Sequence, residues 1–139
     1  MIMPILSVKN FAVSKKFYTE TLGFKQSVSM NDENGNEVFG IFELGKAGFG
    51  LGIDPQGPTP GATVQFMVYV PDSTDLDQYY ADVKARGGAA DDLKTEYWGD
   101  RKFDIKDPDG YWITLCKTVK PMTQEEAAAN NITMTPVNG

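Results

Sequence analysis

Apolar and polar residues alternate most regularly between residues 97 and 115, on both sides of the segment Asp107-Pro108-Asp109-Gly110. Proline presets the φ angle of the second turn position, Asp107 can accept hydrogen bonds from the backbone that follows it, and Gly110 tolerates a positive φ. A three-residue loop that ends in a bulge would pair Asp107 with Tyr111. The stretch is therefore predicted to form a β-hairpin.

The two faces of this hairpin differ in character, because successive side chains of a strand point to opposite sides of a sheet. The apolar face, predicted to lie in the core, carries Phe103, Ile105, Ile113 and Leu115. The other face is polar and aromatic and carries Asp104, Lys106, Trp112 and Thr114. The hairpin alone leaves two interpretations of this second face: a surface in contact with water, or the wall of a binding site.

The rest of the chain repeats one order of elements. Further strands are predicted over residues 2–8, 24–30, 37–44, 49–53, 63–70 and 89–95. One helix is predicted from about Lys15 to Leu22, with Ser14 as its cap and Gly23 as the stop. A second helix, capped by Asp72 or Ser73, is predicted to end at Arg86-Gly87-Gly88. The order β-α-β-β-β thus occurs twice, which predicts an α+β fold.

The domain organisation follows from this repeat. Module one is predicted over residues 1–53, a Pro- and Gly-rich linker over 54–62 and module two over 63–118. Both modules belong to one predicted domain of residues 1–120. A C-terminal tail, residues 121–139, is expected to hold at most two helical turns.

Composition narrows the chemistry. The 139 residues include no histidine, so Ser-His and Cys-His nucleophile pairs and His-containing zinc or iron sites are excluded. Asp, Glu, Lys and Tyr remain as acid–base candidates. The single cysteine, Cys116, lies at the apolar end of a predicted strand, which favours a buried thiol over a nucleophile.

Charge and hydropathy limit the classes of binding partner that this protein could have. The formal net charge of −6 argues against binding to nucleic acid, which needs clustered Lys and Arg. No apolar run approaches the roughly 20 residues that a membrane span requires, and the start of the chain lacks a secretory signal pattern. The expectation is a cytoplasmic protein with no nucleic-acid or membrane partner.

Three stretches of this sequence resemble the vicinal oxygen chelate superfamily, which includes glyoxalase I, extradiol dioxygenases and the bleomycin-resistance proteins. They are the segments 8–24, 68–72 and 98–110, with Trp98-Gly99-Asp100-Arg101-Lys102-Phe103 the most distinctive piece. Together they extend the resemblance over residues 2–118. The resemblance implies two tandem βαβββ modules that form a partly open barrel around a cup, and it implies a homodimer.

Enzymes of the superfamily hold a divalent metal in the cup, and the resemblance places the corresponding positions on Met3, Gly50, Gln65 and Thr114. Only Gln65 is a ligand of the expected type. One neutral amide cannot hold Mg²⁺, Zn²⁺ or Fe²⁺, which need several donors at fixed geometry. We therefore expect no metal, no other cofactor and no catalytic residue of the metalloenzyme kind.

The segment from Trp98 to Phe103 is most similar to the bleomycin-resistance branch, whose members sequester a bulky cationic drug without chemistry. Face parity predicts a cup without metal, beside the glycines 48, 50 and 52, whose lack of side chains would leave volume for a ligand. The predicted ligand-binding residues are Phe39, Gln65, Met67, Tyr69, Trp98, Asp104, Trp112 and Thr114. Aromatic and methionine side chains supply adaptable apolar surface, an indole ring can hold a cation, and Asp104 can orient one.

The sequence alone is compatible with several functions. The leading interpretation is a non-catalytic binding protein that sequesters an aromatic or cationic small molecule. One alternative is a glyoxalase-like lyase or a dioxygenase-like enzyme, and another is a metal-free enzyme with Asp104, Lys106 or Tyr69 as acid or base. A third is an interaction dimer in which the same side chains merely fill the cup.

Overall fold

The computed structural model describes residues 3–57 and 65–133. The first half of the chain forms a four-stranded sheet in the order β1-β4-β3-β2, in which β1 and β4 run parallel and the other neighbours antiparallel. Its elements are β1 Ile5–Val8, α1 Phe11–Lys16, η1 Phe17–Thr21, β2 Lys25–Asn31, β3 Glu37–Leu44 and β4 Ala47–Ile53.

The second half repeats this arrangement in a four-stranded sheet of order β5-β8-β7-β6, in which β5 and β8 run parallel. Its elements are β5 Gln65–Tyr69, α2 Leu76–Ala85, β6 Lys94–Thr95, β7 Asp100–Lys106 and β8 Trp112–Thr118, followed by α3 Gln124–Ala129. The two sheets do not close into a barrel. The predicted α+β fold of two βαβββ modules in a partly open arrangement is confirmed.

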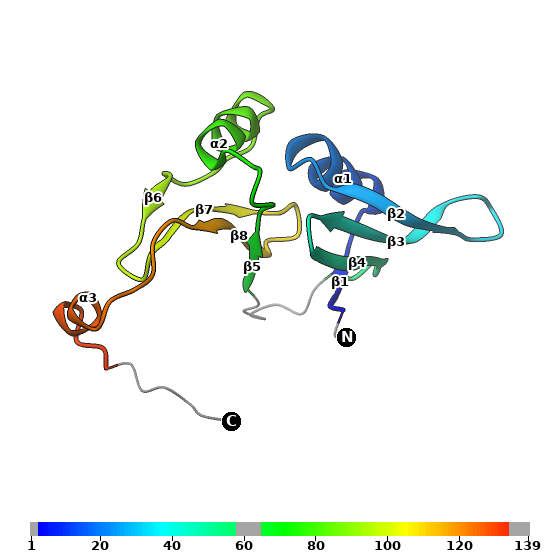
Figure 1. The fold of residues 1–139 in the computed structure, drawn as a ribbon. Helices are drawn as coiled ribbons and strands as arrows, with labels where there is room; N and C mark the ends of the chain where they lie inside the picture. Colours follow the sequence, from blue (N-terminus) through cyan, green and yellow to red (C-terminus); the bar gives the residue numbers. More distant parts are fainter. Residues whose placement is uncertain (1–2, 58–64, 134–139) are drawn as a thin grey trace.

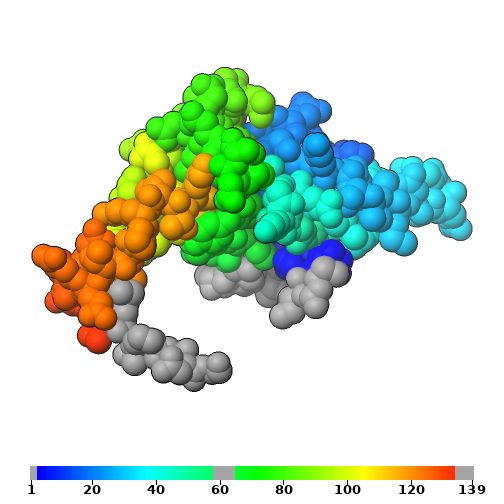
Figure 2. Space-filling model, viewed as in Figure 1, coloured from blue at the N-terminus to red at the C-terminus, as the bar shows by residue number. Residues whose placement is uncertain are grey.

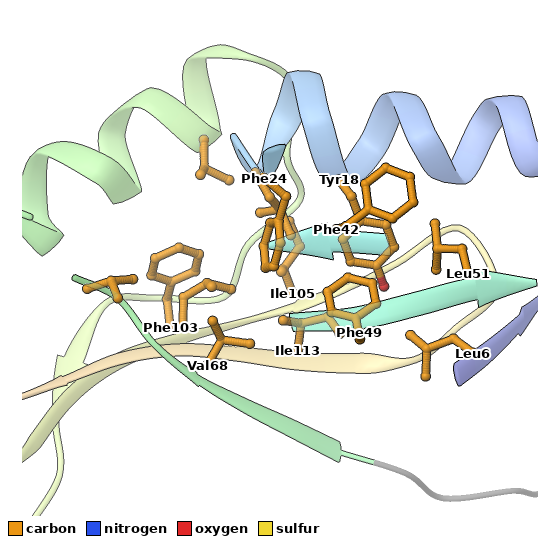
Figure 3. Packing of buried hydrophobic residues seen from close by; sticks show 14 of the residues in the cluster. Leu6, Tyr18, Phe24, Phe42, Phe49, Leu51, Val68, Phe103, Ile105 and Ile113 are labelled. Atoms are coloured by element: carbon orange, nitrogen blue, oxygen red, sulfur yellow. The ribbon is translucent and has the colours of Figure 1, made fainter. Parts of the chain in front are cut away.

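Helices α1 and α2 lie on the same side of the two sheets, and the other side is left open (Figure 1). The surface view shows the two halves in contact, with α3 and the strand that leads to it projecting to one side (Figure 2). One hydrophobic cluster fills the layer between helices and sheets and joins both halves. It includes Leu6, Tyr18, Phe42, Phe49, Leu51, Val68, Phe103, Ile105, Ile113 and Leu115 (Figure 3).

The hairpin forms with the predicted register. Asp107 pairs with Tyr111 through the bond from its N–H to the Tyr111 carbonyl (2.9 Å), and the N–H of Gly110 bonds to the Asp107 carbonyl (3.0 Å). Gly110 has a φ of 88°. Phe103 faces Leu115 across the ladder, and both are almost fully buried.

The predicted helix starts are wrong at both positions. The first helix begins at Phe11, because the side chain of Asn10 accepts a hydrogen bond from the Val13 N–H. Asp75 caps α2 in the same way through the Gln78 N–H, so that helix begins two or three residues later than expected. The predicted C-terminal ends of both helices are confirmed, since Gly23 and Gly87 have the positive φ angles of helix-ending glycines, 76° and 86°.

The strand predicted over residues 89–95 is shortened to β6. Its ladder pairs only Lys94 with Lys102 and Thr95 with Arg101. Before it, a single bond from the Asp91 N–H to the Asp104 carbonyl (2.9 Å) keeps the chain beside β7. Aspartate has low strand propensity, which fits the absence of a longer ladder at Asp91-Asp92.

The turn between β7 and β8 links the two halves. The hydroxyl of Tyr18, fully buried in η1, donates to Asp107 Oδ2 (2.7 Å). Asp109 accepts from the Lys9 N–H (3.0 Å) and from the Ser14 hydroxyl (3.1 Å). The serine predicted to start a helix thus bonds to a residue 95 positions away. This turn fixes how the two sheets sit relative to one another.

Within the described residues, no helix is long and apolar enough to span a membrane.

Candidate ligand-binding site

Three strands of the second sheet place their outward side chains in rows on the side away from the helices. Cross-strand neighbours on one face stand close enough to interact. The first row is Gln65, Trp112 and Lys106, the second is Met67, Thr114 and Asp104, and the third is Tyr69, Cys116 and Lys102. We call this surface the free face of the second sheet.

A chain of hydrogen bonds runs across the second row. Gln65 Nε2 donates to Thr114 Oγ1 (2.8 Å), whose hydroxyl donates to Asp104 Oδ1 (2.5 Å). Lys102 Nζ donates to Asp104 Oδ2 (2.6 Å) and lies 3.8 Å from Glu96 Oε1. Both oxygens of Asp104 are therefore engaged, and the Lys102 ammonium, buried with 9% of the residue exposed, has two carboxylate neighbours.

A second bonded group lies at the end of the same face. Asp100 is almost fully buried, with its Oδ2 accepting from the Tyr69 hydroxyl (2.8 Å) and its Oδ1 from the Thr118 hydroxyl (2.8 Å). Among the described residues, no buried polar side-chain atom lacks a hydrogen-bond partner. The buried polar groups of this face are thus bonded to one another rather than left without partners.

Asp104, Tyr69 and Cys116 have pKa values that differ from those of the free side chains. Burial opposes ionisation of Asp104, but the hydrogen bonds from Lys102 and Thr114 outweigh it and lower the pKa of its carboxyl group. The hydrogen bond to Asp100, together with burial, raises the pKa of Tyr69 to about 12. Burial raises the pKa of Cys116 to about 12, and the thiol is fully buried as predicted.

Three apolar or aromatic side chains are exposed on this face, beside the exposed Gln65 and Lys106. Met67 is 48% exposed, Tyr69 50% and Trp112 38%. The ammonium of Lys106 lies 4.7 Å from the centre of the Trp112 ring, within the range of a cation–π contact. A ligand that approaches this face would meet an indole ring, a phenol ring and a thioether first.

The first sheet also has a free face, and it is almost entirely apolar. Its ladder places Ile5, Phe39, Ile41, Val28 and Met30 on the same side as Gly50 and Gly52. Phe42 is fully buried on the opposite side, so Phe39 is the phenylalanine of β3 that faces outward. Ile5 and Met30 are more than half exposed.

The glycines of β4 do not leave an empty space at every position. A Cβ atom on Gly50 would lie 3.1 Å from the Phe39 ring and 3.3 Å from Ile5. The missing side chain therefore admits the Phe39 ring close to the backbone. Near Gly48 the two sheets leave a cavity of about 250 Å³, which is also lined by Met67 of the other free face.

The structure brings six of the eight predicted residues together. Those six share the free face of the second sheet: Gln65, Met67, Tyr69, Asp104, Trp112 and Thr114. Phe39 lies on the other sheet. Trp98 lies in the turn before β7, where its ring packs edge-on against Tyr97 at 5.1 Å.

Sequence reasoning missed two charged residues of this face, Lys102 and Asp100. The signal that identifies them is the same alternation that selected Asp104, continued towards the start of the strand. Both are buried, and they anchor the hydrogen bonds of Asp104 and Tyr69.

The four positions that correspond to metal ligands carry no ligand set. Gly50 has no donor side chain, and the amide of Gln65 is bonded to Thr114. Met3 precedes β1 and is 37% exposed. Within residues 3–57 and 65–133, no three His, Cys, Asp or Glu side chains are grouped so as to hold a metal ion.

Paired βαβββ units with an open, amphipathic face define a class of proteins built around a cup. A family model described as the Glyoxalase/Bleomycin resistance protein/Dioxygenase superfamily matches residues 2–115. The chain belongs to this superfamily. No curated protein matches the sequence significantly.

Solved structures with the same fold include proteins of different function. An antibiotic-binding protein, TnmS3 from Streptomyces sp. CB03234, is 27% identical, with a TM-score of 0.61 over 85% of this chain and 96% of its own. A bleomycin-binding protein complexed with bleomycin is 19% identical, with a TM-score of 0.62 and coverage of 84% and 97%. A glyoxalase-related enzyme from Clostridium phytofermentans is 20% identical, with a TM-score of 0.66 and coverage of 85% and 94%. At these identities the likeness supports the fold, and the neighbours include both binding proteins and enzymes.

Proposed function

We propose that this protein binds an aromatic or cationic small molecule in its cup and sequesters it without chemical change. The observation that carries the proposal is the state of the free face of the second sheet. Apart from Lys106, its polar side chains are bonded to one another, while Trp112, Tyr69 and Met67 remain exposed. Rigid aromatic surface over a satisfied polar layer suits binding by stacking and apolar contact. Antibiotic-binding neighbours of the same fold support this class of function.

The acid–base chemistry of a metal-free enzyme is disfavoured by the same contacts. A general base or acid works best with a pKa near the working pH. The pKa of Asp104 is lowered, and that of Tyr69 is raised to about 12. Lys106, the remaining acid–base candidate, forms no ion pair with any residue that the structure describes. The lyase and dioxygenase alternatives need metal ligands that the mapped positions Met3, Gly50 and Thr114 do not supply.

A thermal-shift panel on chelator-treated protein tests the proposal, since a ligand that binds only the folded state raises Tm. We expect saturable shifts with aromatic or cationic compounds, recovery of the bound compound unchanged by mass spectrometry, and loss of the shift in Met67→Ala. The matched control is Val13→Ala, which removes an exposed apolar side chain from α1. Conversion of the compound, or a saturable shift with Mn²⁺, Ni²⁺ or Zn²⁺ alone, would overturn the proposal in favour of an enzyme.

We also propose that the protein works as a homodimer in the cytoplasm. The free face of the first sheet exposes Ile5 by 59% and Met30 by 56%, beside the partly buried Phe39. Contiguous exposed apolar surface of this kind marks an interaction site. A second copy that covers it would close the cup over the ligand. The single, buried thiol of Cys116 suits a reducing compartment.

Light scattering on the eluting protein measures the dimer. Ile5→Lys should yield a monomer, because it places a charge in the covered surface. Val13→Lys, at a similarly exposed site on the helix side, should remain dimeric. A parent protein that elutes as a monomer at micromolar concentration would refute the dimer and leave ligand binding to be judged by the thermal shifts.

A further inference from the structure

The charges on the free face of the second sheet are not all equivalent. Asp104 has both oxygens engaged, one by Lys102 and the other by Thr114. Glu96 lies within 3.0 Å of Lys94 and 3.8 Å of Lys102. Asp100 is buried and accepts two hydroxyl hydrogen bonds. Each carboxylate of this face therefore already has the donors it needs.

Lys106 differs from these groups. None of the ion pairs formed between described residues includes it, and its ammonium rests over the Trp112 ring instead. The residue is exposed, and it stands in the first row beside Trp112 and Gln65. The accessible, unpaired charge of the aromatic part of the face is thus positive.

We propose that the ligand is a planar aromatic compound that carries an acidic group, such as a carboxylate. Its ring contacts Trp112 and Met67, and its anionic group pairs with the ammonium of Lys106. This inference rests on the proposed function and narrows its two ligand classes to the aromatic one. The physical reason is that a cationic ligand would find Asp104 already occupied by Lys102, whereas an anionic ligand finds an ammonium with no carboxylate to displace.

A competing site for a cation lies at the edge of the same sheet. A cavity of about 460 Å³ beyond β7 is lined by Asp91, Asp92 and Asp104. Lys94 lines the same cavity, and its ion pair with Glu96 places a positive charge there. The two sites predict opposite charge preferences, so a ligand series that differs only in charge separates them.

The test uses 2-naphthoate, 2-naphthamide and 2-naphthylmethylammonium, which share one ring and differ in charge, with binding followed by isothermal titration calorimetry at low and high salt. A charge-assisted contact at a partly exposed site should make naphthoate bind about fivefold more tightly than naphthamide at low salt, and the preference should shrink at high salt. Lys106→Gln should remove this preference, so that naphthoate and naphthamide bind the variant with equal affinity. The matched control is Lys84→Gln, which removes another lysine that lies over an aromatic ring, Tyr80, on the helix side.

The possible failures are distinguishable. Tightest binding by the ammonium compound, lost in a variant with Asp91→Asn and Asp92→Asn, would overturn the anion assignment and keep the sequestration function. Naphthoate binding that is equal in the parent and in Lys106→Gln would also overturn it. A third outcome is that none of the three compounds binds and that no other aromatic or cationic compound changes Tm. This result would overturn both the inference and the proposed function.

Discussion

Removal of one hydroxyl from the contact between the two halves should destabilise the whole fold. The Tyr18 hydroxyl donates to Asp107 Oδ2 at 2.7 Å, and both residues are buried. Tyr18→Phe keeps the ring and its edge-on contacts with Phe24 and Phe49. The substitution therefore isolates the hydrogen bond.

The expected magnitude follows from what Asp107 retains. Its Oδ1 still accepts from the backbone N–H groups of Asp109 (2.9 Å) and Tyr111 (2.8 Å), so one of three donors is lost. A hydrogen bond to a charged group contributes about 1.5–3 kcal/mol, and we expect Tyr18→Phe to lower the free energy of unfolding by about 2 kcal/mol at pH 7. In urea this corresponds to a decrease of about 1 M in the midpoint with an unchanged slope.

Tyr111→Phe provides the control. Its hydroxyl also joins the halves, but it donates to a neutral acceptor, the Ser7 carbonyl, at 3.1 Å. The loss should be about 0.5–1 kcal/mol. Urea unfolding followed by circular dichroism compares the two variants. If Tyr18→Phe lowers the free energy of unfolding no more than Tyr111→Phe does, the Tyr18–Asp107 hydrogen bond does not hold the two halves together.

The pH dependence supplies a second check. Burial raises the pKa of Asp107, although the hydrogen bonds from Tyr18 and the backbone oppose the shift. Because the folded-state pKa is above the unfolded one, the ionised carboxylate costs folding free energy. Protonation of Asp107 therefore stabilises the fold. This stabilisation is complete below the pKa of Asp107 in the unfolded state and is lost as pH rises through its pKa in the folded state. Loss of the Tyr18 donor raises the folded pKa further. The loss of unfolding free energy caused by Tyr18→Phe should therefore become smaller as pH falls from 7 to about 4. A loss that does not change with pH would show that the Tyr18 hydroxyl does not stabilise the ionised form of Asp107.

Three further predictions concern other parts of the molecule. Trp112→Ala should abolish binding of aromatic compounds in calorimetry yet cost less than about 1.5 kcal/mol in urea, because the side chain is 38% exposed rather than buried. Gly99→Ala should lower stability by more than about 3 kcal/mol in thermal denaturation, because φ is 100° and the new Cβ would lie 1.9 Å from the Lys120 carbonyl oxygen. Asp104→Asn leaves the buried ammonium of Lys102 without its closest carboxylate and should cost about 2 kcal/mol at pH 7. The pKa of Asp104 is lowered in the fold, so its stabilising contribution is complete above the unfolded pKa of about 4 and is lost as pH falls through the folded pKa. The difference between parent and variant in urea unfolding should therefore shrink as pH is lowered below about 4.

The hairpin was predictable in detail because its information is local. Pro108 and Gly110 fix the turn, and the alternation of Phe103, Ile105, Ile113 and Leu115 fixes which face is buried. A shift by one residue would move these side chains into water, so the register is strongly determined. Alternation alone did not decide which face of β3 is buried, because Phe39 and Phe42 lie on opposite faces. The prediction chose Phe39 as the outward residue, and Phe42 is the one in the core.

The helix starts were not predictable because several residues compete for each cap. Asn10 and Ser14 are both favourable caps, and the sequence does not show that the Ser14 hydroxyl bonds to Asp109 instead. Tertiary contacts 95 residues apart decided the outcome. The division into a domain of residues 1–120 and a tail, by contrast, stays a prediction.

The polar layer of the candidate site was only partly predictable. Parity placed Gln65, Asp104 and Thr114 on one face, but the chain of bonds between them depends on the strand order β5-β8-β7. No local signal specifies that order. The pairing of Tyr69 with Asp100, which removes that phenol from the list of effective bases, follows from the same topology.

Alternate residues of strand β7 have different roles, one set in the core between the halves and the other on the outward face. Phe103 and Ile105 face the core and Asp107 ends the strand in the bond to Tyr18, whereas Lys102 and Asp104 face outward. Substitutions on the outward side can change ligand preference without disturbing the packing that joins the halves, and effects at the two sets should be nearly additive where the residues do not touch. This separation gives a physical reason why the outward face of such a sheet can change in sequence while its core and topology are kept.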